Sequence, residues 1–133
     1  MIGAGGNDRL SGGEGFDTLI GGPGSDRFIF DEALSAGSNV DSITDFAAGI
    51  DKIGLADAIF THLGPAGVLG AAHFHVGALA ADASDRIVYN PANGFLFYDS
   101  DGRGGTSELH FATLAAHLAL HNSDFMVIHF LIM

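Results

Sequence analysis

A nine-residue period of glycine and aspartate organises the first thirty residues of the chain. The units GAGGNDRLS, GGEGFDTLI and GGPGSDRFI begin at Gly3, Gly12 and Gly21. A flexible glycine-rich linker has no physical reason to keep a fixed acidic position and a fixed apolar position in every unit. Here the sixth residue of each unit is aspartate, and the eighth residue is apolar: Leu10, Leu19 and Phe28.

This period predicts a short parallel β-roll. The first six residues of a unit form a turn in which glycine permits positive φ, and the last three form a short strand. Side chains alternate along a strand, so the apolar eighth residue points inward. Two units then make one coil of 18 residues, which places Asp8 and Asp26 on one edge and Asp17 on the opposite edge.

The same turns supply hard oxygen ligands. Their glycines expose backbone carbonyls, and each turn adds one carboxylate. Calcium takes about 6–8 such oxygens with tolerant geometry. Without a cation, aligned carboxylates repel one another and the conformational entropy of the glycines opposes folding. The repeat is therefore expected to fold only when calcium binds.

The composition argues against several classes of partner and of cellular location. Sixteen acidic residues against five basic ones give a net charge of -11, which argues against nucleic acid as a partner. The chain has no cysteine, and its start lacks the pattern of a Sec signal peptide. Its apolar runs are shorter than the roughly 18 residues of a membrane span, so no stable membrane insertion is expected.

The repeat resembles the G-G-x-G-x-D-x-U-x unit of RTX proteins, in which it forms a calcium-binding β-roll. The resemblance implies a first site with Asp8 and Asp26, and two further sites in the later turns. The partner turn of Asp17 is expected 18 residues on, where no such unit stands. The implied ligands are the first site's Gly3, Gly5, Asp8, Gly22, Gly24 and Asp26, the second site's Gly12, Glu14 and Asp17, and the third site's Gly21, Pro23 and Asp26.

The segment VDSITDFAAGIDKIGL, from Val40 to Leu55, is similar to the one that follows the last repeat in serralysin-type RTX exoproteins. That resemblance implies that Asp51, with Asp45, helps to close the last calcium site beside Asp26. The alternative is that both are solvated loop carboxylates.

Farther on, the alternation of Ile87, Val88 and Tyr89, the turn signal at Asn90–Gly94 and a return strand at Phe95–Tyr98 predict a β-hairpin. Another strand is expected at 108–111, and a short helix near 57–63. The acidic turn between the hairpin and that strand could hold a weak calcium ion or only form local hydrogen bonds. Its candidate ligands are Asp99 and Asp101.

Two histidine pairs are weaker candidates for zinc. His73 and His75 flank Phe74 as on a strand, and His117 and His121 would share one face of a helix. Half-exposed surface positions explain both pairs as well.

These features predict an all-β protein: a β-roll at residues 1–30, then a mostly antiparallel β-sandwich-like domain at 31–133 with one or two short helices. The second part resembles the C-terminal region of RTX proteins and ends like a type I secretion signal. The resemblance implies a monomeric, secreted, calcium-folded module whose partners are Ca²⁺ and a type I exporter. The chain carries no G-x-S-x-G or HExxH motif, so no enzyme activity is expected. The alternatives are a fragment of an RTX protease, lipase or epimerase, or a calcium-rigidified adhesive module.

Overall fold

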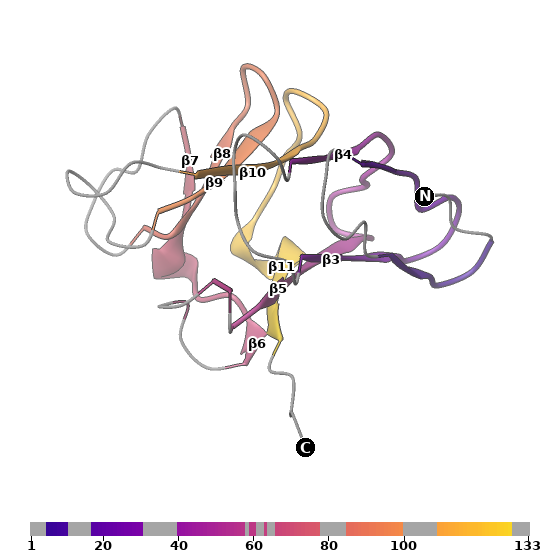
Figure 1. Ribbon diagram of the computed structural model, residues 1–133, viewed down its shortest axis with the longest axis horizontal. Helices are drawn as coiled ribbons and strands as arrows, with labels where there is room; N and C mark the ends of the chain where they lie inside the picture. Colours follow the sequence, from indigo (N-terminus) through magenta and orange to yellow (C-terminus); the bar gives the residue numbers. More distant parts are fainter. Residues whose placement is uncertain are drawn as a thin grey trace.

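The computed structural model describes residues 5–10, 17–30, 40–57, 59–60, 63, 66–77, 85–99 and 109–128 (Figure 1). These residues form strands and two short 3₁₀ turns, η1 (Ala71–His73) and η2 (Asn122–Asp124), with no α-helix among them. The predicted all-β class is confirmed. None of the described segments is a helix long and apolar enough to cross a membrane.

The described strands form two mixed sheets that lie as two layers in Figure 1. The first sheet contains, in spatial order, β1 (Arg9–Leu10), β3 (Arg27–Phe30), β5 (Lys52–Ala56), β11 (Phe125–Ile128) and β6 (Gly67–Val68). The second contains β2 (Thr18–Leu19), β4 (Asp41–Ile43), β10 (Leu109–Thr113), β9 (Phe95–Tyr98), β8 (Ile87–Asn90) and β7 (Phe74–Val76).

The chain crosses from one sheet to the other and back, so that parallel strands stack as successive coils. Arg9 pairs with Arg27, 18 positions on, as the period predicts. Arg27 then pairs with Lys52, 25 positions on, and Thr18 with Ser42, 24 positions on. Both sheets thus continue across residue 30, and the expected division into two domains at that point remains a prediction.

The segment between β5 and β10 widens the end of this stack. Strand β6 pairs antiparallel with β11, while β7, β8 and β9 extend the second sheet. Strands β8 and β9 form the predicted hairpin, whose turn closes with Gly94 N–H donating to the Asn90 carbonyl over 2.8 Å. Gly94 has a φ of 81°, and a Cβ there would meet the Leu114 carbonyl, so this turn requires glycine.

The core lies between the sheets. The apolar eighth residue of each repeat points into it, since Leu10, Leu19 and Phe28 are at most 2% exposed. Toward the later strands the core becomes aromatic. Phe60 makes edge contacts with both Tyr98 and Phe111, at centroid distances of 5.3 and 5.0 Å.

The two expected helical segments differ from the sequence prediction. The described residues near 57–60 form a turn in which Phe60 N–H donates to the Ala56 carbonyl. Residues 114–121 are not helical, and His117 adopts a left-handed φ of 62°. His117 and His121 therefore do not share a helix face. The hydroxyl of Tyr89, which donates to the Ala115 carbonyl over 2.6 Å, fixes this segment instead.

Candidate metal centre

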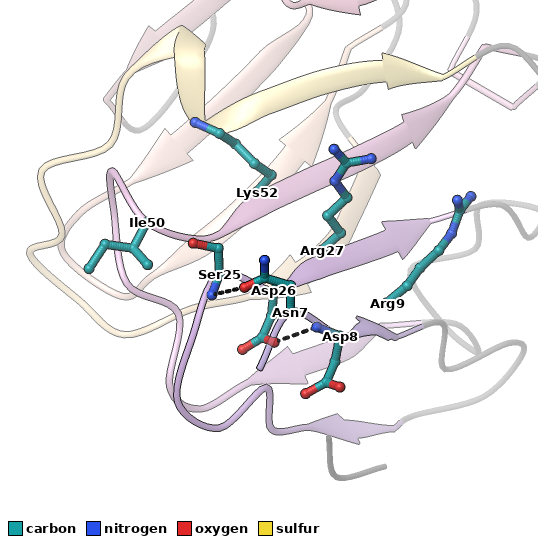
Figure 2. A pocket seen from close by; sticks show the side chains of 8 residues that line it. All are labelled: Asn7, Asp8, Arg9, Ser25, Asp26, Arg27, Ile50 and Lys52. Atoms are coloured by element: carbon teal, nitrogen blue, oxygen red, sulfur yellow. Dashed lines mark hydrogen bonds between the residues drawn. The ribbon is translucent and has the colours of Figure 1, made fainter. Parts of the chain in front are cut away.

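Aspartates stand in register at the start of β1, β3 and β5, and we call Asp8, Asp26 and Asp51 the first aspartate column. Asp26 Oδ1 accepts a 2.9 Å hydrogen bond from the Asp8 N–H (Figure 2). Asp51 Oδ1 accepts an equivalent 2.9 Å bond from the Asp26 N–H. Each carboxylate therefore holds the backbone of the coil before it, and the parallel register places successive carboxylates side by side.

Asp17 and Asp41 form a second aspartate column at the start of β2 and β4. Asp41 Oδ1 accepts a 3.1 Å hydrogen bond from the Asp17 N–H, and the Asp17 carbonyl accepts one of 2.7 Å from the Ser42 N–H. The expectation that Asp17 would face a turn 18 residues on is wrong, because its partner lies 24 residues on. The sequence prediction did not select Asp41, which the stack places beside Asp17. The triplet Asp41-Ser-Ile repeats the Asp-x-apolar end of each unit and could have identified it.

The repeat aspartates share an unusual feature. One carboxylate oxygen, Oδ2, is buried without a hydrogen-bond partner in each of Asp8, Asp17 and Asp26. A buried ionised oxygen without a partner is strongly unfavourable. Asp26 as a whole is only 1% exposed. A hard cation would supply the missing interaction, so these residues fit calcium.

Glycines keep the space around these oxygens open. A Cβ at Gly21 would meet Asp26 Oδ2, and a Cβ at Gly24 would meet the carbonyl oxygen of Gly6. Gly6, Gly22 and Gly24 also have positive φ values of 94°, 81° and 100°. The glycines thus allow two turns to approach each other closely. Backbone carbonyls and carboxylates are the donor types that calcium prefers.

In the second column, burial makes the ionised form of Asp41 unfavourable. Burial raises the pKa of Asp41 from 3.8 to about 6. The hydrogen bond from the Asp17 backbone opposes this shift, whereas the negative charge of Asp17 adds to it. A cation between the two carboxylates would reverse the effect and favour the ionised form.

Asp45 and Asp51 have a different environment. Asp45 accepts hydrogen bonds from Gly21 N–H at 2.9 Å and Gly22 N–H at 2.8 Å. Asp51 uses its second oxygen to accept from the Ala47 N–H at 2.8 Å. Both carboxylates hold backbone turns together, and their role as calcium ligands remains a prediction.

For the remaining predicted ligands, the structure shows little about metal binding. Gly3, Gly12, Glu14 and Asp101 lie outside the described residues. Asp99 is 3% exposed, and its N–H donates to the Arg86 carbonyl. Nowhere in the described ranges do three or more His, Asp or Glu side chains gather as a metal-binding group. Because the aspartates meet in pairs, most ligands of a cation here would be backbone carbonyls.

Comparison with known protein families identifies the first part of the chain. Residues 2–32 match a family model described as the RTX calcium-binding nonapeptide repeat, in four copies. The matched segment contains the three aspartates with unpartnered oxygens. A search of curated proteins found no match to the chain.

Proposed function

Since residues 2–32 carry RTX calcium-binding nonapeptide repeats, we propose that this chain is a calcium-folded module of a secreted protein. The unpartnered, buried Oδ2 atoms of Asp8, Asp17 and Asp26 carry the proposal. An aspartate that served only as a backbone cap would have no reason to bury its second oxygen without a partner.

The proposal assigns the cation sites to the two aspartate columns. Asp8 and Asp26 would hold one ion together with carbonyls of Gly5, Gly22 and Gly24. Asp17 and Asp41 would contribute to another. Bound calcium supplies positive charge that offsets the repulsion within each pair. The chain's own contribution is the stack itself, which brings carboxylates of successive coils together through hydrogen bonds of 2.9 and 3.1 Å.

If folding depends on calcium, the chain folds only where the calcium concentration is high enough. Extracellular calcium modules have dissociation constants of about 10⁻⁴–10⁻³ M. At lower calcium the net charge of -11 opposes the compact state through self-repulsion. We propose that the chain passes a type I exporter unfolded and folds outside as a monomer. The proposal gives the chain itself no catalytic role.

A calcium titration tests the proposal. Far-UV circular dichroism and amide hydrogen exchange of the whole chain are followed from excess chelator to millimolar calcium, with magnesium as the control cation. Each site adds about 2.7 kcal/mol at one hundred times its Kd. Strand signal and amide protection in β1–β3 should therefore rise with calcium and not with magnesium. A chain that is equally folded in excess chelator contradicts the proposal.

A further inference from the structure

The turn of the β8–β9 hairpin contains the single Asn-Gly pair of the sequence, Asn93-Gly94. In such a pair the backbone nitrogen of glycine can attack the side-chain amide carbon of asparagine, because glycine has no Cβ to hinder the approach. Asn93 is exposed to solvent. The turn nevertheless requires Gly94, whose φ is 81° and whose Cβ would meet the Leu114 carbonyl. The fold therefore keeps a reactive pair at an exposed position.

Two hydrogen bonds of the folded turn oppose this attack. The Gly94 N–H donates to the Asn90 carbonyl over 2.8 Å, so the proton that the attacking nitrogen must lose is held in a hydrogen bond. Asn93 Oδ1 accepts from the Phe95 N–H over 3.0 Å, which holds the side-chain amide as in an Asx turn. Gly94 is itself buried. The attack therefore requires the turn to open.

The turn also docks on the segment that follows β10. The Leu114 N–H donates to the Gly94 carbonyl over 2.8 Å, and the His117 N–H donates to the Pro91 carbonyl over 2.9 Å. The Tyr89 hydroxyl bonds to two further backbone groups of that segment. In Figure 1 the hairpin loop and the loop after β10 lie side by side. Opening the turn thus requires two loops to separate, which has a free-energy cost.

We propose that Asn93 is a site of spontaneous deamidation, which the folded turn prevents and which unfolded, calcium-free chains undergo. The Gly94 nitrogen forms a bond to Cγ of Asn93, the Cγ–Nδ2 bond breaks, and the proton of the nitrogen leaves with the amide group as ammonia. Solvent water then opens the cyclic imide at either carbonyl. One product is aspartate, and the other is isoaspartate, in which the main chain runs through Cγ. The reaction of calcium-free chains rests on the proposed function, whereas the protection by the turn does not.

Isoaspartate at this position prevents the turn from docking. It lengthens the main chain before Gly94 by one carbon atom. Gly94 has no room for this change, since even a Cβ there would meet the Leu114 carbonyl. A chain that remains without calcium therefore loses, with time, the ability to close this turn, whereas a chain folded in calcium keeps it.

Peptide mapping of the whole chain by mass spectrometry tests the site. Samples are kept at mildly alkaline pH in calcium, in excess chelator and in urea. Deamidation of tryptic peptide 87–103 should appear in urea and in chelator and be about tenfold slower in calcium, because the turn must open first. Asn90 of the same peptide cannot react in this way, because Pro91 has no N–H. Asn122, which precedes serine, is the internal control and should react more slowly than Asn93 in urea.

Two variants separate the steps. Tyr89→Phe loosens the docked segment without changing the Asn-Gly pair. It should speed the deamidation in calcium by about fivefold, as expected for a lost buried hydrogen bond, and leave the rate in urea unchanged. Asn93→Asp carries the charge of the product without the extra carbon atom, and in calcium it should keep the Leu114 and His117 amides protected from hydrogen exchange. The isoaspartate form, isolated from aged chain, should lose that protection.

The contrary outcomes are distinct. Equal rates for Asn93 and Asn122 in urea would overturn Asn93 as the site. Retained protection of the Leu114 and His117 amides in the isoaspartate form would overturn the undocking, and an unchanged rate in Tyr89→Phe would overturn the role of the docked segment. If circular dichroism shows that calcium folds the chain but Asn93 reacts as fast as in urea, this inference fails and the proposed function stands. If the chain is equally folded and protected in chelator, the proposed function fails and the protection by the turn stands.

Discussion

The aspartates of the repeat segment and those that follow it differ in how their second oxygen is used. Asp8, Asp17 and Asp26 each bury one oxygen without a hydrogen-bond partner. Asp45 and Asp51, by contrast, accept backbone N–H groups with both oxygens.

Asp124 belongs with the second group, although sequence reasoning did not select it. Its two oxygens accept from the Gly49 and His121 N–H groups, both at 2.8 Å. Asp45, Asp51 and Asp124 are thus satisfied by backbone N–H groups, whereas Asp8, Asp17 and Asp26 each keep one buried oxygen without a protein partner. The comparison teaches that similar Asp-x-apolar triplets differ in whether the second carboxylate oxygen accepts from the backbone or is buried without a partner.

The largest expected effect comes from a later aspartate. Asp51→Ala leaves the N–H groups of Asp26 and Ala47 without their acceptor in a site that is 2% exposed. We expect a loss of about 3 kcal/mol in the free energy of unfolding. Urea denaturation at several calcium concentrations above the folding midpoint should give the same loss each time. A loss that grows with calcium would place Asp51 among the ligands.

Two glycines with positive φ give a matched test of the close approach between turns. Gly24 and Gly49 have φ values of 100° and 83°, but only at Gly24 would a Cβ meet another backbone atom, the Gly6 carbonyl oxygen. Gly49→Ala should cost about 1 kcal/mol of unfolding free energy. Gly24→Ala should cost about 2 kcal/mol, because the turns must also separate. Equal losses in urea denaturation would show that the approach is not needed.

The two aspartate columns can be compared through their calcium midpoints. Asp26 has carboxylate neighbours on both sides, Asp8 and Asp51, whereas among the described residues Asp17 has Asp41 alone. Asp26→Asn should raise the calcium concentration at half-folding by about tenfold, equivalent to about 1.4 kcal/mol. Asp17→Asn should raise it less.

Asp41→Asn provides the control for this comparison. It should shift the calcium midpoint as far as Asp17→Asn does, because the two residues would hold the same ion. If Asp41→Asn left the midpoint unchanged while Asp17→Asn raised it, the second column would not be a shared site.

The smallest expected effect is a pH effect on the later strands. Burial lowers the pKa of His110, against the opposing hydrogen bond of the Ala112 backbone. The ring stacks on Phe95 at a centroid distance of 4.0 Å. Because the folded chain disfavours the protonated ring, stability should fall as the pH drops below about 6.5. His110→Gln should flatten this slope in thermal unfolding at saturating calcium, and an unchanged slope would assign it to other groups.

The sequence predicts the regular part of the fold well. A strict nine-residue period determines both the register of the strands and which side chains face the core. The 18-residue step from Asp8 to Asp26, the inward Leu19 and the hairpin turn at Gly94 all depend on neighbouring residues. Each is confirmed by a pairing or a burial value. The unpartnered Oδ2 atoms of Asp8, Asp17 and Asp26 also depend on this period, because it places each aspartate at the same position of a stacked coil.

The irregular part could not be predicted in this way. After the repeat, paired aspartates are separated by 24 and 25 residues and no longer by 18. No local sequence pattern predicts how many residues are inserted between successive coils there. The partner of Asp17 is therefore fixed by the stack and not by its own unit. Residues 114–121 look helical in their apolar spacing. The Tyr89 hydroxyl and the left-handed His117 override that preference.

The position of β5 between β3 and β11 sets an order of assembly. Pairing with β3 joins Arg27 to Lys52, while pairing with β11 joins Ile53 to Phe125, 72 positions on. Loop-closure entropy increases with the length of the enclosed chain, so the second edge of β5 closes later than the first. Until β11 arrives, β5 presents an unpaired edge that another molecule can extend. Rapid transfer into calcium at high protein concentration should therefore favour strand-paired aggregates, and slow transfer at low concentration should favour the monomer.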